Sequence, residues 1–153
     1  KKIIEIWIKK INKLQPDAEL HIFTTSKLNI DNLKKFNVYF HGKISRKRLL
    51  NFYKQSFGMI CLGYDETFCL NAIEAMKMGL PVISLGETAL NELIVNNKNG
   101  LKVNNLMNID RSILKLLSLN RAERSKIGQT SSAFTKKFDS RHIFKKWTKL
   151  ISN

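Results

Sequence analysis

The chain has 153 residues, which is the length of one ordinary domain and enough to bury a sizeable hydrophobic core. Hydrophobic residues make up 43% of the sequence, but no apolar run approaches the roughly 20 residues that a membrane-spanning helix needs. The 27 lysines and arginines exceed the 12 acids and give a net charge of +15. This charge favours anionic partners such as a nucleotide diphosphate or an anionic membrane. The lysines are dispersed and accompany no nucleic-acid motif, so we expect no nucleic-acid partner.

The two cysteines, Cys61 and Cys69, are too few and too oddly spaced for a zinc site. Such sparse cysteine usage is typical of a reduced domain. We therefore expect a cytoplasmic location, which includes the inner face of the membrane.

The first third of the chain predicts alternating helices and strands. Residues 2–14 repeat apolar side chains at helical spacing with lysines on the other face, and residues 18–24 read as a buried strand. A polar connection at 26–35 contains a short helical stretch with Asp31 as its N-cap, and a strand follows at 38–42. Ser45 should cap the next helix. That helix should turn these side chains inward: Leu49, Leu50, Phe52, Tyr53 and Phe57.

The middle of the chain predicts a strand–loop–helix–strand unit. Residues 58–62 are a short apolar run, and Gly79 should end the helix that follows the loop. Pro81 opens the next buried strand. The apolar face of the helix is expected to contain Leu70, Ile73, Met76 and Leu80. In such a unit the loop delivers side chains and unpaired backbone amides to the carboxyl edge of a parallel sheet, where ligands bind.

The rest of the chain is mostly helical by pattern. A short helix passes through Glu92 and Ile94, the composition of 96–100 predicts a turn, and 101–103 predicts a last strand. Three helices should follow, beginning near Ile109, Arg121 and a cap at Ser140. The order of strands and helices predicts an α/β fold with a Rossmann-like, doubly wound parallel sheet.

The loop and helix of the central unit carry a specific pattern. Glu66 and Glu74 have seven residues between them, and Ala75-Met76, Gly79 and Pro81-Val82 follow. This pattern resembles the signature of retaining glycosyltransferases with the GT-B fold, of the group-1, family-four type that uses nucleotide sugars. The resemblance implies that residues 1–153 are the carboxyl-terminal, nucleotide-sugar-binding domain of a longer two-domain enzyme.

In the family, a strand precedes the first helix, and its loop carries an Arg and a Lys that hold the donor phosphates. The present sequence starts in or just before that helix. We therefore expect the sheet to lack its central first strand, which another chain segment supplies unless the remaining strands close the gap. We also expect the isolated chain to be inactive without the amino-terminal acceptor domain.

The resemblance also implies roles for individual residues. Glu66 would contact the donor sugar and oppose the developing positive charge, and Glu74 would accept hydrogen bonds from the ribose hydroxyls. Backbone N–H groups would face the sugar at Phe68 and Cys69, and the diphosphate at Leu70 and Asn71. The backbone of Gly42, Lys43 and Ile44 would lie against the nucleobase. Glu92 would order a loop of the site without contacting the donor. No Asp-x-Asp motif is present, so we expect no metal or other cofactor beyond the nucleotide-sugar substrate.

We therefore expect a hexosyltransferase or a related enzyme that passes a sugar to a glycan or lipid-linked acceptor in polysaccharide biosynthesis. Two alternatives remain. A sugar-nucleotide epimerase of GT-B architecture is disfavoured by the spacing of the two glutamates. A noncatalytic, basic membrane-association module is suggested by the net charge and by the basic carboxyl-terminal helix.

Overall fold

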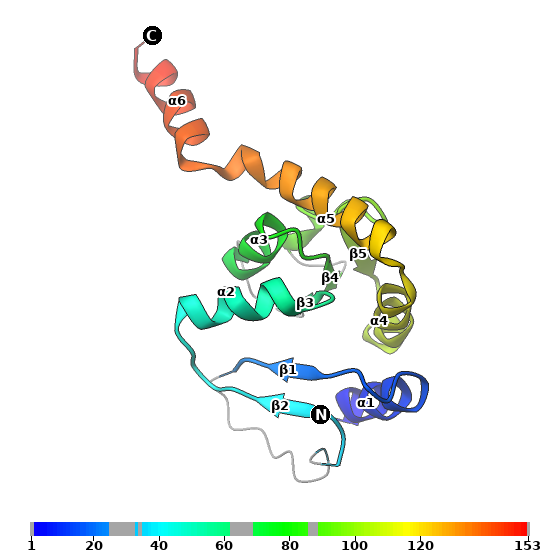
Figure 1. Ribbon diagram of the computed structural model, residues 1–153. Coiled ribbons are helices and arrows are strands. Elements are labelled where there is room, and N and C mark those ends of the chain that lie inside the picture. The colour runs from blue at the N-terminus through cyan, green and yellow to red at the C-terminus, as the bar shows by residue number, and fades with distance from the viewer. Residues whose placement is uncertain (1, 25–32, 34, 62–68, 86–88, 153) are drawn as a thin grey trace.

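A computed structural model describes residues 2–24, 33, 35–61, 69–85 and 89–152 of the chain. The helices and strands appear in the predicted order (Figure 1). The α-helices are α1 (Lys2–Leu14), α2 (Arg46–Gln55), α3 (Leu70–Lys77), α4 (Ile109–Ser118), α5 (Arg121–Thr135) and α6 (Ser140–Ile151). The strands are β1 (Leu20–Ile22), β2 (Val38–Phe40), β3 (Met59–Cys61), β4 (Val82–Leu85) and β5 (Gly100–Val103). Short 3-10 helices are η2 (Ala89–Glu92), η3 (Leu106–Asn108) and η4 (Lys136–Phe138).

The described strands form two parallel sheets rather than one. β1 pairs with β2, and β4 lies between β3 and β5 in the second sheet. In the doubly wound order 3-2-1-4-5-6, these strands occupy every position except the central first one. The missing position lies between β1 and β3, which face each other across the gap between the sheets in Figure 1. The remaining strands therefore do not close the gap within the described residues.

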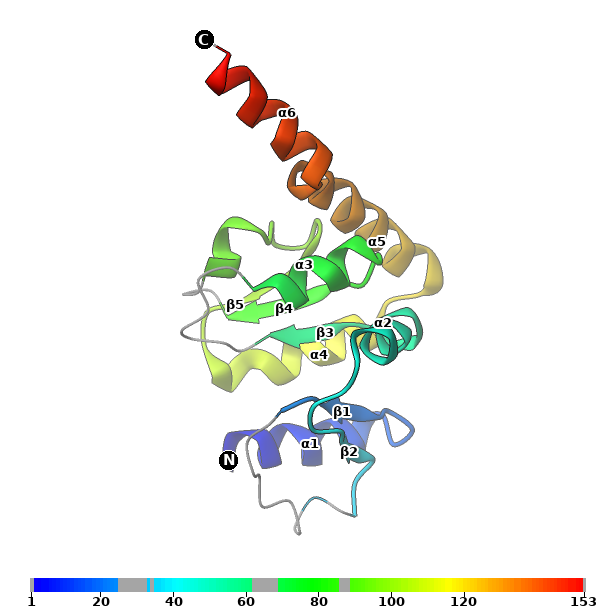
Figure 2. The same ribbon diagram turned by 90° about the vertical axis from the view of Figure 1, so that its left-hand side faces the viewer.

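The three-stranded sheet is covered on both faces (Figure 2). On one face, α1 and α4 contribute Trp7, Ile109 and Leu116 to a core with Ile83 and Leu101 of the strands. On the other face, α2 and α3 build a second core with the side chains of these residues: Tyr53, Ala72, Ile73, Ala75, Met76 and Val82. This α/β layering confirms the predicted fold class.

A buried carboxylate links α1 to α4. Asp110, in the first turn of α4, is almost fully buried and forms an ion pair with Lys10 of α1. Burial by itself would raise the pKa of Asp110, but the hydrogen bonds from Lys10 and from the backbone of Arg111 outweigh it and lower that pKa. The ion pair joins α1 to α4 on the face of the three-stranded sheet that these two helices cover.

Some details differ from the sequence prediction. Leu14, Phe57 and Leu70 are exposed rather than inward-facing, because Leu14 and Leu70 are terminal residues of their helices and Phe57 follows the end of α2. The Arg124 guanidinium covers the Phe57 ring at 4.1 Å. β1 is shorter than expected and only half-buried. Asp139, not Ser140, caps α6, since its side chain accepts a hydrogen bond from Arg141. The expected N-cap at Asp31 lies outside the described residues.

Aromatic rings form a cluster at the two-stranded sheet of β1 and β2. His21 lies on β1 and His41 just after β2, and Nδ1 of His21 is within hydrogen-bond distance, 2.8 Å, of Nε2 of His41. Tyr39 stacks against the His21 ring and Phe23 against the His41 ring, while the Phe52 ring lies tilted beside His21. Burial lowers the pKa of His41 from its usual 6.5, and the charges of His21 and Arg48 lower it further. The cluster therefore favours a neutral His41.

This cluster predicts a dependence of stability on pH. The unfolded chain binds a proton to His41 more readily than the folded chain does, so stability is full above about pH 6.5 and falls as the pH drops below it. We expect the melting temperature, followed by circular dichroism, to drop between pH 7.5 and pH 5.5. His41→Phe keeps an aromatic ring and removes the titration, so its drop should be smaller. Equal drops in the two proteins would contradict the assignment.

Candidate functional site

The carboxyl ends of β3 and β4 form the edge where the predicted site lies. Cys61 is the last residue of β3, and Cys69 is the N-cap residue of α3. Parallel pairing of β3 with β4 brings Cys61 opposite Ser84 at the same edge. Ligands of open α/β sheets bind at such edges, next to helix N-termini.

The start of α3 presents its backbone to this edge. The Cys69 side chain does not cap the helix, and Leu70 and Asn71 occupy the first turn, whose N–H groups have no acceptor within a helix. Both of these side chains are exposed. The buried Sγ atoms of Cys69 and Cys61 lie 3.0 Å apart, which fixes the end of β3 to the beginning of α3. The arrangement leaves backbone amides available to an anion.

Glu74 lies one turn further along α3 and is 26% exposed. Its Oε1 atom contacts Nη2 of Arg46 at 2.6 Å. The ring of Tyr53 is buried beside it in the core under α2 and α3. Burial raises the pKa of the Tyr53 phenol to about 12, with smaller contributions from Glu74 and the two cysteines, Cys69 and Cys61. The phenol is therefore neutral, and the carboxylate is turned toward α2.

The predicted nucleobase loop follows β2. Gly42 has φ +59°, a conformation that favours glycine, and nothing would meet a Cβ atom there. Lys43 is exposed and Ile44 is half-buried. Ser45 then caps α2 by accepting a hydrogen bond from Arg48, as predicted. Since Arg46 follows at once, the ion pair to Glu74 brings this loop and α3 into one region.

Three other predicted residues are not joined to this region by a described contact. Glu66 and Phe68 lie outside the described residues. Glu92 is exposed at the end of η2, on the segment that follows β4.

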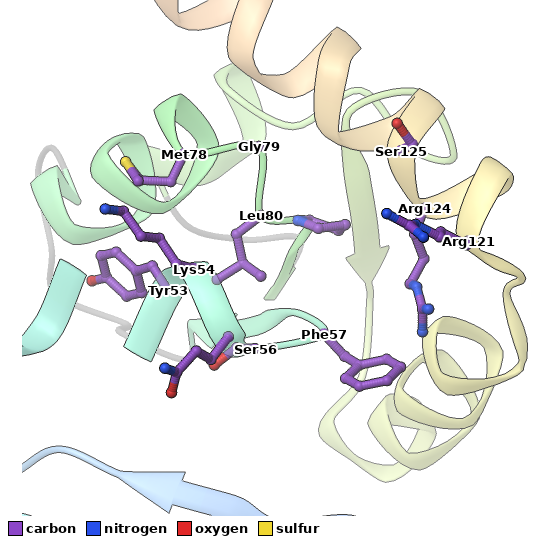
Figure 3. Close-up of a pocket in the computed structure, with 12 residues that line it drawn as sticks. Tyr53, Lys54, Ser56, Phe57, Met78, Gly79, Leu80, Arg121, Arg124 and Ser125 are labelled. Atoms are coloured by element: carbon purple, nitrogen blue, oxygen red, sulfur yellow. The ribbon is translucent and has the colours of Figure 1, made fainter. Parts of the chain in front are cut away.

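A pocket among the described residues lies away from this region (Figure 3). Its volume is about 290 Å³, and its walls come from the segment before β3, the turn before β4 and the start of α5. Lys54, Arg121 and Arg124 line it together with Phe57. These segments flank the amino ends of the strands, so the pocket lies at the opposite edge from Glu74 and the start of α3.

Within the described residues, no group of three or more His, Cys, Asp or Glu side chains is arranged to hold a metal ion. None of the described helices is long and apolar enough to cross a membrane.

Sequence reasoning missed Arg46. A signal for it exists, because Arg46, Lys47 and Arg48 are consecutive cations in the first turn of α2, which contains no acid. Cations are disfavoured at the positive end of a helix. Their presence indicates that an anion lies nearby, and Glu74 is the anion that the structure shows.

Comparison with known proteins agrees with this fold. The family model described as "Glycosyl transferases group 1" matches residues 3–133. No curated protein matches the sequence well enough to be counted as a relative. Among solved structures, TarM of S. aureus is similar over 99% of this chain and 32% of its own, with 20% identity and a TM-score of 0.79. The chain thus spans about a third of the length of TarM.

Two further structures are similar. The carboxyl-terminal domain of the group 1 glycosyl transferase LpcC from Francisella tularensis matches 90% of this chain and 78% of its own, with 22% identity and a TM-score of 0.70. The pneumococcal O-GlcNAc transferase GtfA, crystallised with UDP and GlcNAc, matches 99% of this chain and 32% of its own, with 19% identity and a TM-score of 0.75. The structures establish the fold, and the family model covers most of the sequence. The chain belongs to the group 1 glycosyl transferases.

Proposed function

We propose that this chain is the donor-binding domain of a retaining glycosyltransferase that moves a hexose or a related sugar from a nucleotide diphosphate to a glycan or lipid-linked acceptor. The observation that carries the proposal is the position of Glu74 and the α3 N-terminus at one edge of the sheet, next to the loop after β2. A carboxylate that accepts hydrogen bonds from ribose hydroxyls is the arrangement found in dinucleotide folds. The similar GtfA was crystallised with UDP and GlcNAc, which supports a nucleotide-sugar donor.

The proposed division of work follows the pattern of residues. Glu74 holds the ribose, the amides of Leu70 and Asn71 face the diphosphate, and those of Phe68 and Cys69 face the sugar. Gly42, Lys43 and Ile44 lie against the base through their backbone. Glu66 opposes the positive charge that develops on the sugar as the diphosphate leaves. Glu92 orders a loop of the site without contacting the donor. We propose that these hydrogen bonds and charges act without a metal ion.

We further propose that residues 1–153 act within a longer enzyme of two domains. The gap between β1 and β3 supports this proposal, because a parallel strand placed there would join the two sheets into the doubly wound order. The loop after such a strand would bring the cations that hold the donor phosphates. The acceptor would bind mainly to the other domain, in a cytoplasmic pathway of polysaccharide assembly.

Glu74→Ala should weaken the binding of the nucleoside diphosphate by about 1–3 kcal/mol, because the ribose loses one or two hydrogen bonds to a charged group. Calorimetric titration with UDP, GDP and ADP, beside the variant, measures this loss. Lys77→Ala, an exposed change at the end of the same helix, is the matched control. Unchanged affinity in Glu74→Ala would show that the ribose assignment is wrong.

One feature favours a membrane contact as an additional function. All residues of α6 are exposed, and in both views the helix extends away from the rest of the described chain (Figures 1 and 2). Its apolar side chains share one face, its cations lie on the other, and it contains no acid. The apolar face consists of Ile143, Phe144, Trp147, Leu150 and Ile151. Basic amphipathic helices of this kind lie in the surface of anionic membranes.

The membrane contact predicts sedimentation with vesicles. The protein should pellet with vesicles that contain an anionic lipid and not with neutral ones, and added salt should weaken the binding. Trp147→Glu, which places an acid on the apolar face, should abolish sedimentation. Failure of the unmodified protein to bind anionic vesicles at low salt would remove the membrane contact.

A further inference from the structure

The ion pair between Arg46 and Glu74 has a consequence for the nucleotide site. We propose that Arg46 is a positioning residue, which holds one oxygen of the Glu74 carboxylate so that the carboxylate meets the ribose hydroxyls of the donor. The inference rests on the proposed donor site. It adds a residue from α2 to a site that the sequence pattern placed on α3 and two loops.

Stability does not account for this contact. The Arg46 side chain is 75% exposed, and ion pairs at such exposed positions contribute little to folding. Arg46 is also the first residue of α2, where the helix dipole disfavours a cation, and Lys47 and Arg48 add to the repulsion. A residue placed at a cost to its own helix, yet paired with the predicted ligand-binding carboxylate, indicates a role in binding.

The geometry suits a positioning role. The contact of 2.6 Å between Nη2 and Oε1 is a short, charge-assisted one, which orients the carboxylate. A carboxylate offers two oxygens with about four lone-pair sites, so one guanidinium contact leaves capacity for two hydroxyl groups.

The position of Arg46 in the chain links the two halves of the proposed site. Arg46 lies two residues after Ile44, the last residue of the loop assigned to the base. Contact of the base with this loop therefore also fixes the start of α2, from which Arg46 reaches Glu74. Recognition of the base and of the ribose would be coupled through this one side chain.

The alternative is that Arg46 only attracts the anionic diphosphate through its charge. Lys47 provides the matched control, because it is the next residue, is exposed and carries the same charge. If Arg46 acted through its charge alone, Arg46→Gln would weaken the binding of ribonucleotides and of 2′-deoxyribonucleotides equally. Arg46→Gln and Lys47→Gln would then have the same effect. A positioning role acts on the ribose contact, so it changes the preference between the two sugars.

The experiment measures the affinity of the chain for the one among UDP, GDP and ADP that binds best, and for its 2′-deoxy form. We expect Arg46→Gln to lower the affinity for the ribonucleotide about 3- to 10-fold, the equivalent of one hydrogen bond, and to reduce the preference over the 2′-deoxy form. Lys47→Gln should keep that preference. Arg46→Gln combined with Glu74→Gln should bind no more weakly than Glu74→Gln alone.

Two results would overturn the inference while the donor site stands: an unchanged sugar preference in Arg46→Gln, or equal losses in Arg46→Gln and Lys47→Gln. Thermal unfolding of the two single variants and the double variant is the folding control, and their melting temperatures should stay close to that of the unmodified chain because so exposed an ion pair contributes little to stability. Absence of binding to all three diphosphates by the unmodified chain would instead count against the proposed donor site.

Discussion

Gly128→Ala should lower the stability of the domain by about 1–3 kcal/mol, the usual cost of forcing an extra carbon into a packed region. A Cβ atom at Gly128 of α5 would lie 2.3 Å from the carbonyl oxygen of Gly79, which is backbone and has little freedom to move. Gly79 in turn has φ +77° in the turn that ends α3. Close approach of these two glycines lets α5 pack on α3, the helix that carries Glu74.

The direction of this effect is a sharp test, because helix propensity alone predicts the opposite sign. Alanine in a helix is favoured over glycine by about 1 kcal/mol, so a helix with free space would become more stable. Ser125→Ala, an exposed change one turn earlier in α5, is the control and should alter stability by less than about 0.5 kcal/mol. Denaturant unfolding measures both variants. A Gly128→Ala protein at least as stable as the unmodified one would show that α3 and α5 do not approach so closely in solution.

Periodicity and turn residues were sufficient to predict most of the fold. The strand–loop–helix–strand unit, the end of α3 at Gly79 and the Ser45 cap of α2 all depend on local signals, and the structure confirms them. The residues that face the core were harder to predict near the ends of elements. Leu70 and Phe57 continue an apolar pattern, yet both are exposed, since Leu70 is the first residue of α3 and Phe57 follows the end of α2.

Some residues of the site could likewise be predicted from local patterns, and others could not. Glu74 could be named from the sequence because it belongs to a fixed spacing along one helix. Its partner Arg46 is distant in the chain, and only the packing of α2 against α3 brings the two together. The prediction of a missing strand came from the resemblance to the family, in which a strand precedes the first helix. The break between β1 and β3 depends on hydrogen bonds between strands, which no local pattern specifies.

Glu66→Ala, made in the longer enzyme to which we assign this domain, should reduce turnover on the order of 100-fold or more while donor affinity changes little. Removal of a group that opposes charge in the transition state has effects of this size. The affinity for the ground-state nucleotide should persist, because Glu66 is assigned to the sugar and not to the ribose. Steady-state kinetics give the turnover, and titration with the nucleoside diphosphate gives the affinity.

The comparison with Glu74→Ala makes this prediction specific. That variant should raise the KM for the donor by about 10-fold or more, because its hydrogen bonds to the ribose form in the ground state and in the transition state alike. Glu66→Gln separates charge from hydrogen bonding, and turnover as low as in the alanine variant would identify the negative charge as the contribution that matters. Glu5→Gln on α1, remote in sequence from both assigned carboxylates, should leave both quantities unchanged. A Glu66→Ala enzyme that retains turnover but loses donor affinity would exchange the assigned roles of the two glutamates.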